Sequence, residues 1–596
     1  MKSQTQSNKE IARLLRDVAA AYLLRNEIRF KIIAYEKAAD TIEQMNRELK
    51  DIWKEGKMKG IPGIGPTITT HLEELFKTGQ SEHFNSIIWS MPEAIYPLMR
   101  VPSIGPKKAF KLVKELKIKK ADKAVDTLLK LALDGKIETI EGFGAKSQDE
   151  IIKAIQLYKQ SDRKSERMPL PYAKELAKQI IAYMKQLEYI NHIDAMGSMR
   201  RSVSTIGDID IALSCPEEKT EEVIKHFTAY PLKVDVDNAG AKKASIIVSP
   251  NIRIDLRVQE EKSYGSMLQY FTGSKAHNVK LREYALRKGL SLSEWGIKET
   301  DTGKLHEFEN EETFYAYLDL PLIPPEIREG TNEIDIARKD KLPELVTLKD
   351  IKGDLHTHSS YDLKPSHDFG ENTYEEMAEK AVSLGYHYIG FSDHNPNTSN
   401  NTSVDIINIM KKRREDIDHI FRSKKYDHIK TFVSLECDIM PSGELALPDE
   451  AIEYVDYLVV SIHSSFRQDR KTMTDRVLKA LSKPKVKIFG HPTGRLLGKR
   501  EGIELDWDKI FALVKEKNIA FEVNSWPERL DLPDTLVREA VEQGIKLVIN
   551  TDAHAVSQMD GMEYGVAVAR RGWASKHDIM NTLPYSEFKK WILERR

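Results

Sequence analysis

The chain has 596 residues, more than one hydrophobic core usually holds, and its length predicts several domains. With 40% apolar and 31% charged residues and no apolar run long enough to span a bilayer, the composition excludes a disordered or membrane-embedded protein. Cys215 and Cys437 are the only cysteines, which excludes a disulfide framework, and the N-terminus lacks a secretory signal. We therefore expect a cytoplasmic protein.

The first 160 residues predict short helices separated by glycine-containing turns. A pattern of glycines among apolar residues precedes a helical stretch three times, at 61–66, 101–106 and 140–144, with Ser103 replacing one glycine of the second copy. Glycine lets the backbone approach a ligand closely, and a helix start offers unpaired N–H groups to a phosphate. One copy would equally fit a tight turn between packed helices, but three copies spaced about 40 residues apart favour binding to the DNA backbone. The expected DNA contacts are Gly63, Gly65, Gly105, Gly142 and Gly144, with Lys107 and Lys108 at the start of a lysine-rich helix.

Three aspartates lie on two predicted strands in the middle of the chain. Asp208 and Asp210 flank Ile209, and the period of two in a strand places both carboxylates on one face while Ile209 enters the core. Asp255 lies on a second alternating segment. An Asp-X-Asp pair alone is common on exposed strands. Three close carboxylates repel one another, however, and favour a site for two Mg²⁺ ions that also bind substrate phosphates.

Two further segments flank these acids. Upstream, a Gly-Ser turn with two arginines, 197–201, suits a polyphosphate that the metal ions bridge. Downstream, the adjacent aromatic residues Tyr270 and Phe271 suit stacking on a sugar or base, and Asn278 and Arg282 can reach its edges.

These motifs resemble the family X DNA polymerases, the family of DNA polymerase beta, over about residues 1–320. The resemblance implies helix-hairpin-helix elements, an α+β nucleotidyltransferase palm and a thumb, and gap filling in DNA repair. It implies that Asp208, Asp210 and Asp255 bind the metal ions and that Asp255 also helps to activate the primer 3′-hydroxyl. It further implies that the triphosphate is bound by the turn of Gly197, Ser198 and Arg201, and that the nucleotide pocket is lined by Tyr270, Phe271, Gly273 and Asn278, with Arg282 on the templating side.

One position departs from the family pattern. The animal repair enzyme forms a Schiff base to a deoxyribose phosphate through a lysine in the helix after its first hairpin. His71 occupies the matching position here, and an imidazole cannot form that iminium intermediate. A lyase activity of this type is therefore not expected from His71, although Lys31 or another amine is an alternative.

A proline-rich segment, 321–345, predicts an irregular interdomain linker. Beyond it, seven short apolar runs alternate with helical stretches, which predicts a parallel sheet closed into a barrel. In six of the seven runs a histidine or an acid lies at or just past the end of the strand, where barrel enzymes place their chemistry. A single histidine is more often a packing or surface residue, but recurrence in strand after strand indicates a metal cluster. Nitrogen and oxygen ligands in this number suit more than one Zn²⁺ or Mn²⁺ ion.

From about residue 346 to the end, the chain resembles the PHP (polymerase and histidinol phosphatase) domain, a distorted seven-stranded α/β barrel with three metal ions. The implied ligands are His356, His358, His394, Glu436, His463, His491, Asp552 and His554. The first motif of the family also contains an acid, for which Asp368 is our choice, with His367 and Asp362 as alternatives. The resemblance implies 3′–5′ exonuclease activity with Mn²⁺, and as further possibilities apurinic-site endonuclease or 3′-phosphatase activity.

The expected protein is therefore multidomain. Its parts are an N-terminal helical domain at 1–85, a helical DNA-binding domain at 86–160, the palm at 161–262, the thumb at 263–320, the linker at 321–345 and the PHP domain at 346–596. Its expected partners are gapped or nicked double-stranded DNA and dNTPs. Two alternatives are a DNA-end phosphoesterase whose polymerase-like half only binds DNA, and a DNA-end scaffold without activity. The intact metal motifs argue against both.

Overall fold

The computed structural model describes residues 8–44, 49–54, 56, 58, 61, 63–101, 104–163, 167–248 and 252–594. Pro62, Pro102 and Ser103 of the predicted glycine motifs lie outside the described residues. The chain divides into two compact units, which we describe separately. The first comprises Met1–Lys164, Lys364–Phe369 and His394–Thr402, and the second comprises Ser165–Leu363, Gly370–Asp393 and Ser403–Arg596. The finer, six-part division expected from the sequence stays a prediction.

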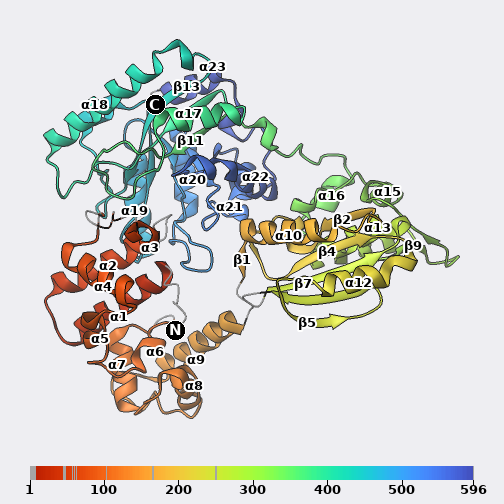
Figure 1. Ribbon diagram of the computed structural model, residues 1–596, viewed down its shortest axis with the longest axis horizontal. Coiled ribbons are helices and arrows are strands. Elements are labelled where there is room, and N and C mark those ends of the chain that lie inside the picture. The colour runs from red at the N-terminus through yellow and green to blue at the C-terminus, as the bar shows by residue number, and fades with distance from the viewer. Residues whose placement is uncertain are drawn as a thin grey trace. The chain divides into compact units, whose positions relative to one another are not determined.

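The N-terminal part is helical throughout its described residues, as the sequence predicted (Figure 1). Its helices bury two apolar clusters, one around Leu15, Leu72 and Phe84 and the other around Leu112 and Leu128. The helices are α1 (Asn8–Leu24), α2 (Arg29–Gln44), α3 (Leu49–Lys54), α4 (Pro66–Thr78), α5 (Glu82–Ile88), α6 (Ile95–Leu98), α7 (Pro106–Glu115), α8 (Ala124–Leu133) and α9 (Ala145–Arg163).

A five-stranded sheet in the order β2-β4-β7-β6-β5 forms the palm of the second unit. Strands β4 and β7 pair in parallel, and Asp210 lies directly opposite Asp255. Ile209 and Ile211 are fully buried on either side of the half-buried Asp210, as predicted, but Ala212 and Ser214 are buried too, so the alternation does not continue along β4. The palm elements are β1 (Met168–Pro169), α10 (Leu170–Met184), β2 (His192–Ala195), α11 (Gly197–Arg200), β3 (Thr205–Ile206), β4 (Ile209–Ser214), α12 (Thr220–Thr228), β5 (Lys233–Ala239), β6 (Lys243–Val248) and β7 (Ile252–Gln259).

The thumb follows with its own core around Leu281 and Phe314. Segment 321–345, expected to lack regular structure, contains the 3-10 helix η4 (Pro325–Ile327) and α16 (Glu333–Ala337), and Ile327 and Ile334 pack into this core. The prolines mark the turns around these short helices rather than an absence of structure. The other thumb elements are α13 (Tyr264–Thr272), α14 (Lys275–Leu286), β8 (Leu290–Ser293), β9 (Gly296–Glu299), β10 (Leu305–His306) and α15 (Glu311–Tyr317).

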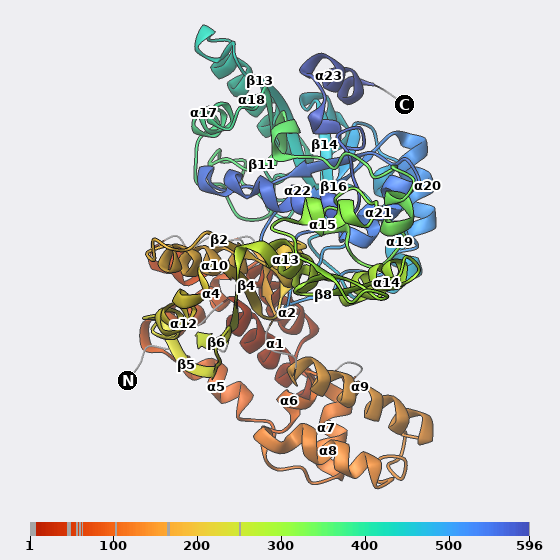
Figure 2. The same ribbon diagram turned by 90° about the vertical axis from the view of Figure 1, so that its right-hand side faces the viewer.

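All seven apolar runs of the C-terminal half are strands, and they pair in parallel in chain order. A parallel bridge between Thr357 and Ala553 brings the first strand back to the end of the last, so the barrel is nearly closed. The strands are β11 (Gly353–Thr357), β12 (Tyr388–Phe391), β13 (Lys430–Asp438), β14 (Tyr457–Ser461), β15 (Val486–Phe489), β16 (Ala520–Asn524) and β17 (Leu547–Asn550). The helices around them are α17 (Tyr374–Ser383), α18 (Ser403–Phe421), α19 (Arg470–Leu481), α20 (Trp507–Lys517), α21 (Asp534–Glu542) and α22 (Met562–Arg571) (Figures 1 and 2).

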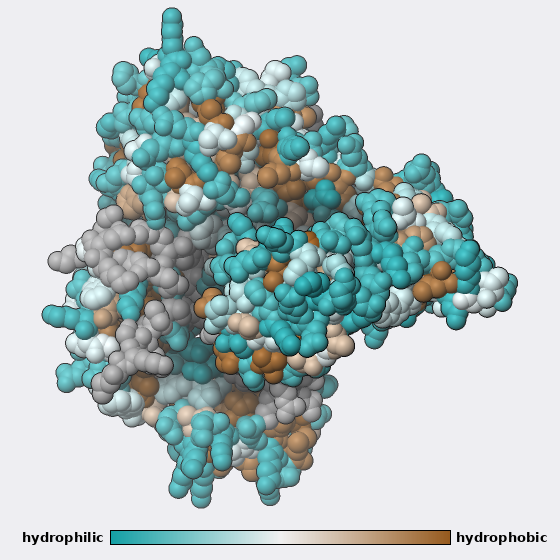
Figure 3. Space-filling model, turned by 45° about the vertical axis from the view of Figure 1, so that its right-hand side comes forward, coloured by the Kyte–Doolittle hydropathy of each residue, from teal (hydrophilic) through white to brown (hydrophobic). Residues whose placement is uncertain are grey.

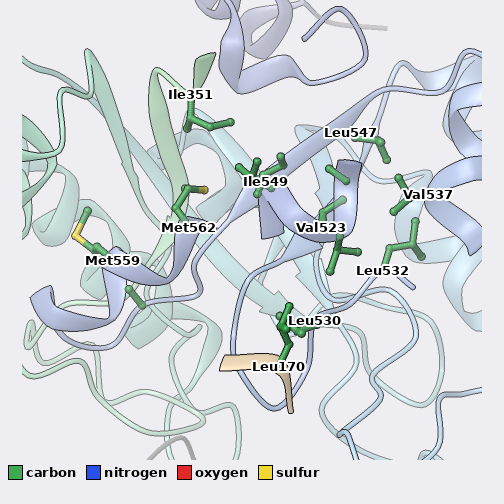
Figure 4. Packing of buried hydrophobic residues seen from close by; sticks show 14 of the residues in the cluster. Leu170, Ile351, Val523, Leu530, Leu532, Val537, Leu547, Ile549, Met559 and Met562 are labelled. Carbon is green, nitrogen blue, oxygen red and sulfur yellow. The ribbon is translucent and has the colours of Figure 1, made fainter. Parts of the chain in front are cut away.

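The two faces of the barrel strands pack differently because successive side chains of a strand point to opposite sides. On β14, Leu458 and Val460 join the large cluster beneath the surrounding helices, whereas Tyr457 and Val459 join an inner cluster. Figure 4 shows part of the large cluster, in which side chains of β16 and β17 meet those of α21 and α22. Every strand contributes to the inner cluster, and the last helix, α23 (Tyr585–Leu593), completes it with Phe588, Trp591 and Ile592. We call this inner cluster the apolar plug. Because it fills its part of the barrel interior, the polar side chains lie at the carboxyl ends of the strands.

Among the described helices, none combines the length and the apolar character that a bilayer crossing requires. On the face drawn in Figure 3, hydrophilic side chains predominate and apolar ones are scattered among them.

Candidate active sites

The three palm acids lie near the start of β4, on the two neighbouring inner strands β4 and β7. Asp208 directly precedes β4, Asp210 lies within it, and Asp255 faces Asp210 across the parallel pair. Burial raises the pKa of Asp210 to about 6, and repulsion by Asp255 and Asp208 adds to the shift. Carboxylates that repel one another in this way suit a site for divalent cations, because the positive charge would favour their ionised form.

The turn before these acids requires glycine. Gly197 has a φ of +60°, and a Cβ there would collide with the carboxylate of Asp210. The predicted phosphate-binding turn therefore lies directly against the predicted metal site. Its two arginines are held differently: Arg200 donates to Glu311 (2.6 Å) and to Thr272 Oγ1 (2.8 Å), whereas Arg201 donates to Glu329 (3.1 Å).

The carboxylate of Asp255 is oriented by two neighbours that the sequence reading did not assign to the site. Ser245 Oγ donates to Oδ1 of Asp255, and Nε of Arg253 donates to the same oxygen at 3.0 Å. Arg253 also pairs with Asp237 at 2.9 Å. The alternation of strand β7, which the sequence did show, is the signal that places Arg253 on the same face as Asp255.

The expected nucleotide pocket lies at the junction of α13 and α14. The rings of Tyr270 and Phe271 meet edge to face at 5.0 Å, and the guanidinium of Arg257 lies 3.8 Å from the centre of the Phe271 ring. Nδ2 of Asn278 donates to the carbonyl of Tyr270 at 2.7 Å, which joins the two helices across Gly273. Arg282 lies one turn further along α14 and is exposed.

Each predicted glycine motif ends at the start of a helix. Helices α4 and α7 begin after Gly65 and Gly105, and α9 begins after Gly144. Gly63 and Gly142 have φ values of +86° and +80°, which favour glycine. The exposed Lys107 and Lys108 occupy the first turn of α7. A DNA phosphate backbone binds to helix starts of this kind, which offer unpaired N–H groups, and to adjacent lysines.

His71 lies on α4, where its ring stacks on that of His83 at a centroid distance of 4.1 Å. Burial lowers the pKa of both imidazoles. Nε2 of His83 lies 2.8 Å from the hydroxyl of Tyr22, and Lys31 pairs with Glu27 at 3.2 Å. The position that carries the family's lysine is therefore part of a packed aromatic group.

Four buried residues form the centre of the barrel site. Ligand atoms of His356, His358, Glu436 and Asp552 all lie within 4.8 Å of one another. Nε2 of His356 lies 3.4 Å from Glu436 and 3.5 Å from Asp552, and this nitrogen makes no hydrogen bond. A buried imidazole nitrogen that faces two carboxylates without a hydrogen bond fits a metal ligand.

Three more predicted ligands adjoin this centre. Nε2 of His491 and Nε2 of His463 lie 2.9 and 3.3 Å from the same oxygen of Glu436, and the ring of His554 stacks on that of His358 at 4.0 Å. Burial lowers the pKa of His491 to about 4, helped by a nearby guanidinium. Burial opposes protonation of His356 too, yet the surrounding carboxylates raise its pKa well above the usual range. The site thus concentrates negative charge of the kind that metal cations balance.

The remaining predicted ligands, Asp368 and His394, lie on the two loops that belong to the first unit. Nε2 of His394 is 3.6 Å from Oδ1 of Asp368, and the ring of His367 meets that of His394 edge to face at 4.9 Å. Asp368 and His367 thus both approach His394. The choice between Asp368, His367 and Asp362 stays a prediction.

Glu522 is a functional residue that the sequence reading missed. It lies on β16, fully buried, and its carboxylate meets Nδ1 of His356 (2.7 Å), the backbone N–H of His491 (2.8 Å) and Nδ2 of Asn550 (2.9 Å). A glutamate between the apolar residues Phe521 and Val523 was the available signal, because a buried charge must be paired. Asp438 plays the same part for His463, at 2.7 Å from its Nδ1.

The carboxylate of Asp393, by contrast, is occupied by protein groups and is not available as a metal ligand. Its carboxylate pairs with Arg413 at 2.7 Å and accepts from the hydroxyl of Tyr374 at 2.7 Å and from the backbone of Ser359. The end of β12 is therefore fixed by a buried ion pair.

Known proteins match this chain along nearly its full length. Family models match for a helix-hairpin-helix domain at residues 6–81, a DNA polymerase beta thumb at 267–329 and a PHP domain at 354–526. The DNA polymerase/3′-5′ exonuclease PolX of Bacillus subtilis (strain 168) is 35% identical over 590 residues, which cover 98% of this chain and 99% of that protein. This chain belongs to the family X DNA polymerases with a C-terminal PHP domain. The predicted family and fold class are confirmed.

Other relatives match one half of this family X polymerase each. The rat DNA polymerase lambda is 21% identical over 309 residues, 49% of each chain. A probable phosphatase of Thermoanaerobacter sp. (strain X514) is 22% identical over 253 residues, 41% of this chain and 95% of the phosphatase. Both halves therefore belong to metal-dependent families.

Proposed function

We propose that this family X polymerase extends DNA 3′ ends in its palm and removes 3′ nucleotides in its barrel. The observation that carries the proposal is the register of Asp210 with Asp255 beneath the Gly197 turn, together with a separate histidine and acid cluster in the barrel. The match to a protein named as both a polymerase and a 3′-5′ exonuclease supports the pairing of the two activities.

In the palm, Asp208, Asp210 and Asp255 would hold two Mg²⁺ ions, which supply charge neutralisation to the triphosphate and lower the pKa of the primer hydroxyl. Arg253 and Ser245 fix the Asp255 carboxylate toward the primer end. Ser198 and Arg201 bind the triphosphate, and the Tyr270–Phe271 pair packs against the incoming sugar. Asn278 and Arg282 then contact the nucleotide and the template. Positioning and charge stabilisation account for most of the rate of phosphoryl transfer.

We propose gapped or nicked double-stranded DNA and dNTPs as substrates. The helix starts after Gly65, Gly105 and Gly144 would bind the DNA backbone, and Lys107 and Lys108 would add attraction to phosphates without reading the sequence. His71 supports no Schiff base, which favours the barrel for the processing of DNA ends, with Lys31 or another amine as the alternative.

The barrel ligands would hold Mn²⁺ or Zn²⁺, three ions by the family pattern, and these supply a hydroxide near neutral pH for attack on the phosphodiester. Glu522 and Asp438 hold the Nδ1 atoms of His356 and His463, so that their Nε2 atoms would be left to bind the ions. Two histidines and two acids at the centre match the nitrogen and oxygen donors that such ions prefer.

A primer–template assay on a gapped duplex, with and without dNTPs, tests both activities. Asp208→Ala with Asp210→Ala should abolish extension and spare 3′ degradation, because the two sites are built from different residues. His356→Ala with His358→Ala should do the reverse. The two-site proposal fails if either folded double variant loses both activities. Degradation without any incorporation by the unmodified protein, with Mg²⁺ or Mn²⁺, would indicate the phosphoesterase alternative instead.

A further inference from the structure

The palm and the barrel share one apolar cluster within the second unit. Leu170, at the start of α10, and Leu530 of the barrel loops both belong to this cluster (Figure 4). Nearby, Lys174 of α10 pairs with Glu563 of α22 at 3.0 Å. Helix α22 of the barrel therefore lies against the palm.

Arg571, the last residue of α22, reaches the phosphate-binding turn of the palm. Its Nη1 donates to the backbone carbonyl of Arg201 at 2.8 Å and to Oε1 of Glu329 at 2.8 Å. On its other side, Nε and Nη2 lie 2.7 and 2.6 Å from Asp534 of α21. The Arg571 side chain is 7% exposed, so its guanidinium is largely shielded from solvent.

Glu329 connects Arg571 to the side chain of Arg201. The oxygen of Glu329 that binds Arg571 also accepts from Nε of Arg201 at 3.1 Å, and Nη1 of Arg201 donates to the carbonyl of Thr272 at 2.5 Å. Within the described residues, the third nitrogen of Arg201, Nη2, makes no hydrogen bond. Two nitrogens thus fix the plane of the guanidinium while the third stays available for a ligand.

We propose that Arg571 of the nuclease barrel is a positioning residue of the polymerase site. It holds the backbone of Arg201 directly and its guanidinium through Glu329, so that the free edge of Arg201 is oriented before the triphosphate arrives. This inference rests on the proposed function, in which Arg201 binds the triphosphate. An arginine loses much side-chain entropy on binding, and fixing it beforehand strengthens the binding of the ligand.

The neighbouring Arg570 provides a matched control. Arg570 also joins α22 to the end of the thumb, because its Nε donates to Glu326 at 2.8 Å and its Nη1 donates to the carbonyl of Val346 at 3.0 Å. Neither of these two bonds involves Arg201. Lys174 is a second control because its pair with Glu563 joins the palm and α22 elsewhere. A general loosening of palm and barrel would affect these variants as well.

The test measures KM for dNTP and kcat in single-nucleotide gap filling by the full-length protein. Arg571→Met should raise KM by about tenfold, the effect of losing one hydrogen bond between charged groups, and change kcat by less than about twofold. Glu329→Gln should raise KM as well. The double variant should not exceed the larger single effect, because both residues act through Arg201. Arg570→Met and Lys174→Ala should keep the KM of the unmodified protein, and 3′ degradation should be unchanged in all five variants.

The inference is overturned if Arg571→Met keeps the original KM, if Glu329→Gln lowers it, or if Arg570→Met raises it equally. Arg201→Lys separates the inference from the proposed function: an unchanged KM in that variant means that Arg201 does not bind the triphosphate. If Arg571→Met unfolds, as shown by its thermal transition, Arg571→Lys replaces it. Lysine keeps the charge but cannot bind Glu329, Asp534 and a carbonyl in one plane, so its KM should be intermediate.

Discussion

Nδ1 of His356 lies 2.7 Å from the fully buried carboxylate of Glu522. Because an ionised carboxylate only accepts, the imidazole donates from Nδ1, and its Nε2 is left to face Glu436 and Asp552. The pair fixes both the tautomer and the direction of the central ligand.

Glu522→Gln should therefore weaken the barrel site without touching the palm. We expect a loss of about 10- to 100-fold in metal affinity or in the rate of 3′ degradation, as for other carboxylates that orient a ligand histidine. Metal content after dialysis and the degradation rate measure this, and primer extension should be unchanged. Glu516→Gln, an exposed residue of α20, is the control. Full metal content and full degradation in Glu522→Gln would show that His356 needs no such partner.

Gly197→Ala should abolish primer extension. The methyl group would meet the carboxylate of Asp210, and the φ of +60° is strained for alanine. The degradation of 3′ ends should persist because the barrel is built from other residues. Gly240→Ala, in the same palm, adds only an ordinary van der Waals contact and should extend primers normally. Extension by Gly197→Ala at the normal rate would mean that the turn does not lie against Asp210 during catalysis.

The pKa of Asp210 is raised from an ordinary 3.8 to about 6, and this shift predicts how the stability of the metal-free protein depends on pH. Between about pH 4 and pH 6 the folded state binds more protons than the unfolded state, so the free energy of unfolding falls as the pH rises through this range. In chelator-treated protein, Asp210→Asn should thus be more stable than the unmodified chain at pH 7, by about 1–3 kcal/mol, and no more stable near pH 3.5. Thermal unfolding at both pH values measures the difference. A less stable Asp210→Asn at pH 7 would contradict the raised pKa of Asp210, which burial causes first and the neighbouring acids second.

Lys107→Ala with Lys108→Ala should weaken DNA binding at every sequence alike. Loss of two phosphate contacts should reduce the slope of log K against log salt concentration by about 1.8. Titration of a fluorescent gapped duplex at several salt concentrations measures the slope. Lys411→Ala with Lys412→Ala, an exposed adjacent pair on α18, should leave the slope nearly unchanged. Equal slopes for the two double variants would remove α7 from the DNA interface.

Periodicity and local chemistry explain what the sequence predicts well. The strand period of two places Ile209 and Ile211 in the core with Asp210 between them, and short apolar runs ending in histidines or acids give all seven barrel strands. These features depend on neighbours along the chain. The packing of segment 321–345 into the thumb core depends instead on contacts with distant residues, which no local pattern contains.

For the same reason, the sequence did not indicate the residues that support the two sites. Glu522 interrupts an apolar strand, but its partners His356 and Asn550 lie on two other strands and become neighbours only when the barrel closes. Arg571 lies 370 residues from Arg201 in sequence. Long-range pairs of this kind follow from topology, not from spacing.

In the proposed nuclease function, DNA would reach the barrel ligands from the side opposite the apolar plug that α23 completes. A DNA strand cannot be threaded through it, so each released nucleotide leaves by the opening through which the 3′ end arrived. The shortened end must draw back to let that product out before it is cut again. Trimming should therefore proceed in separate visits, and between visits the same end is free to be extended.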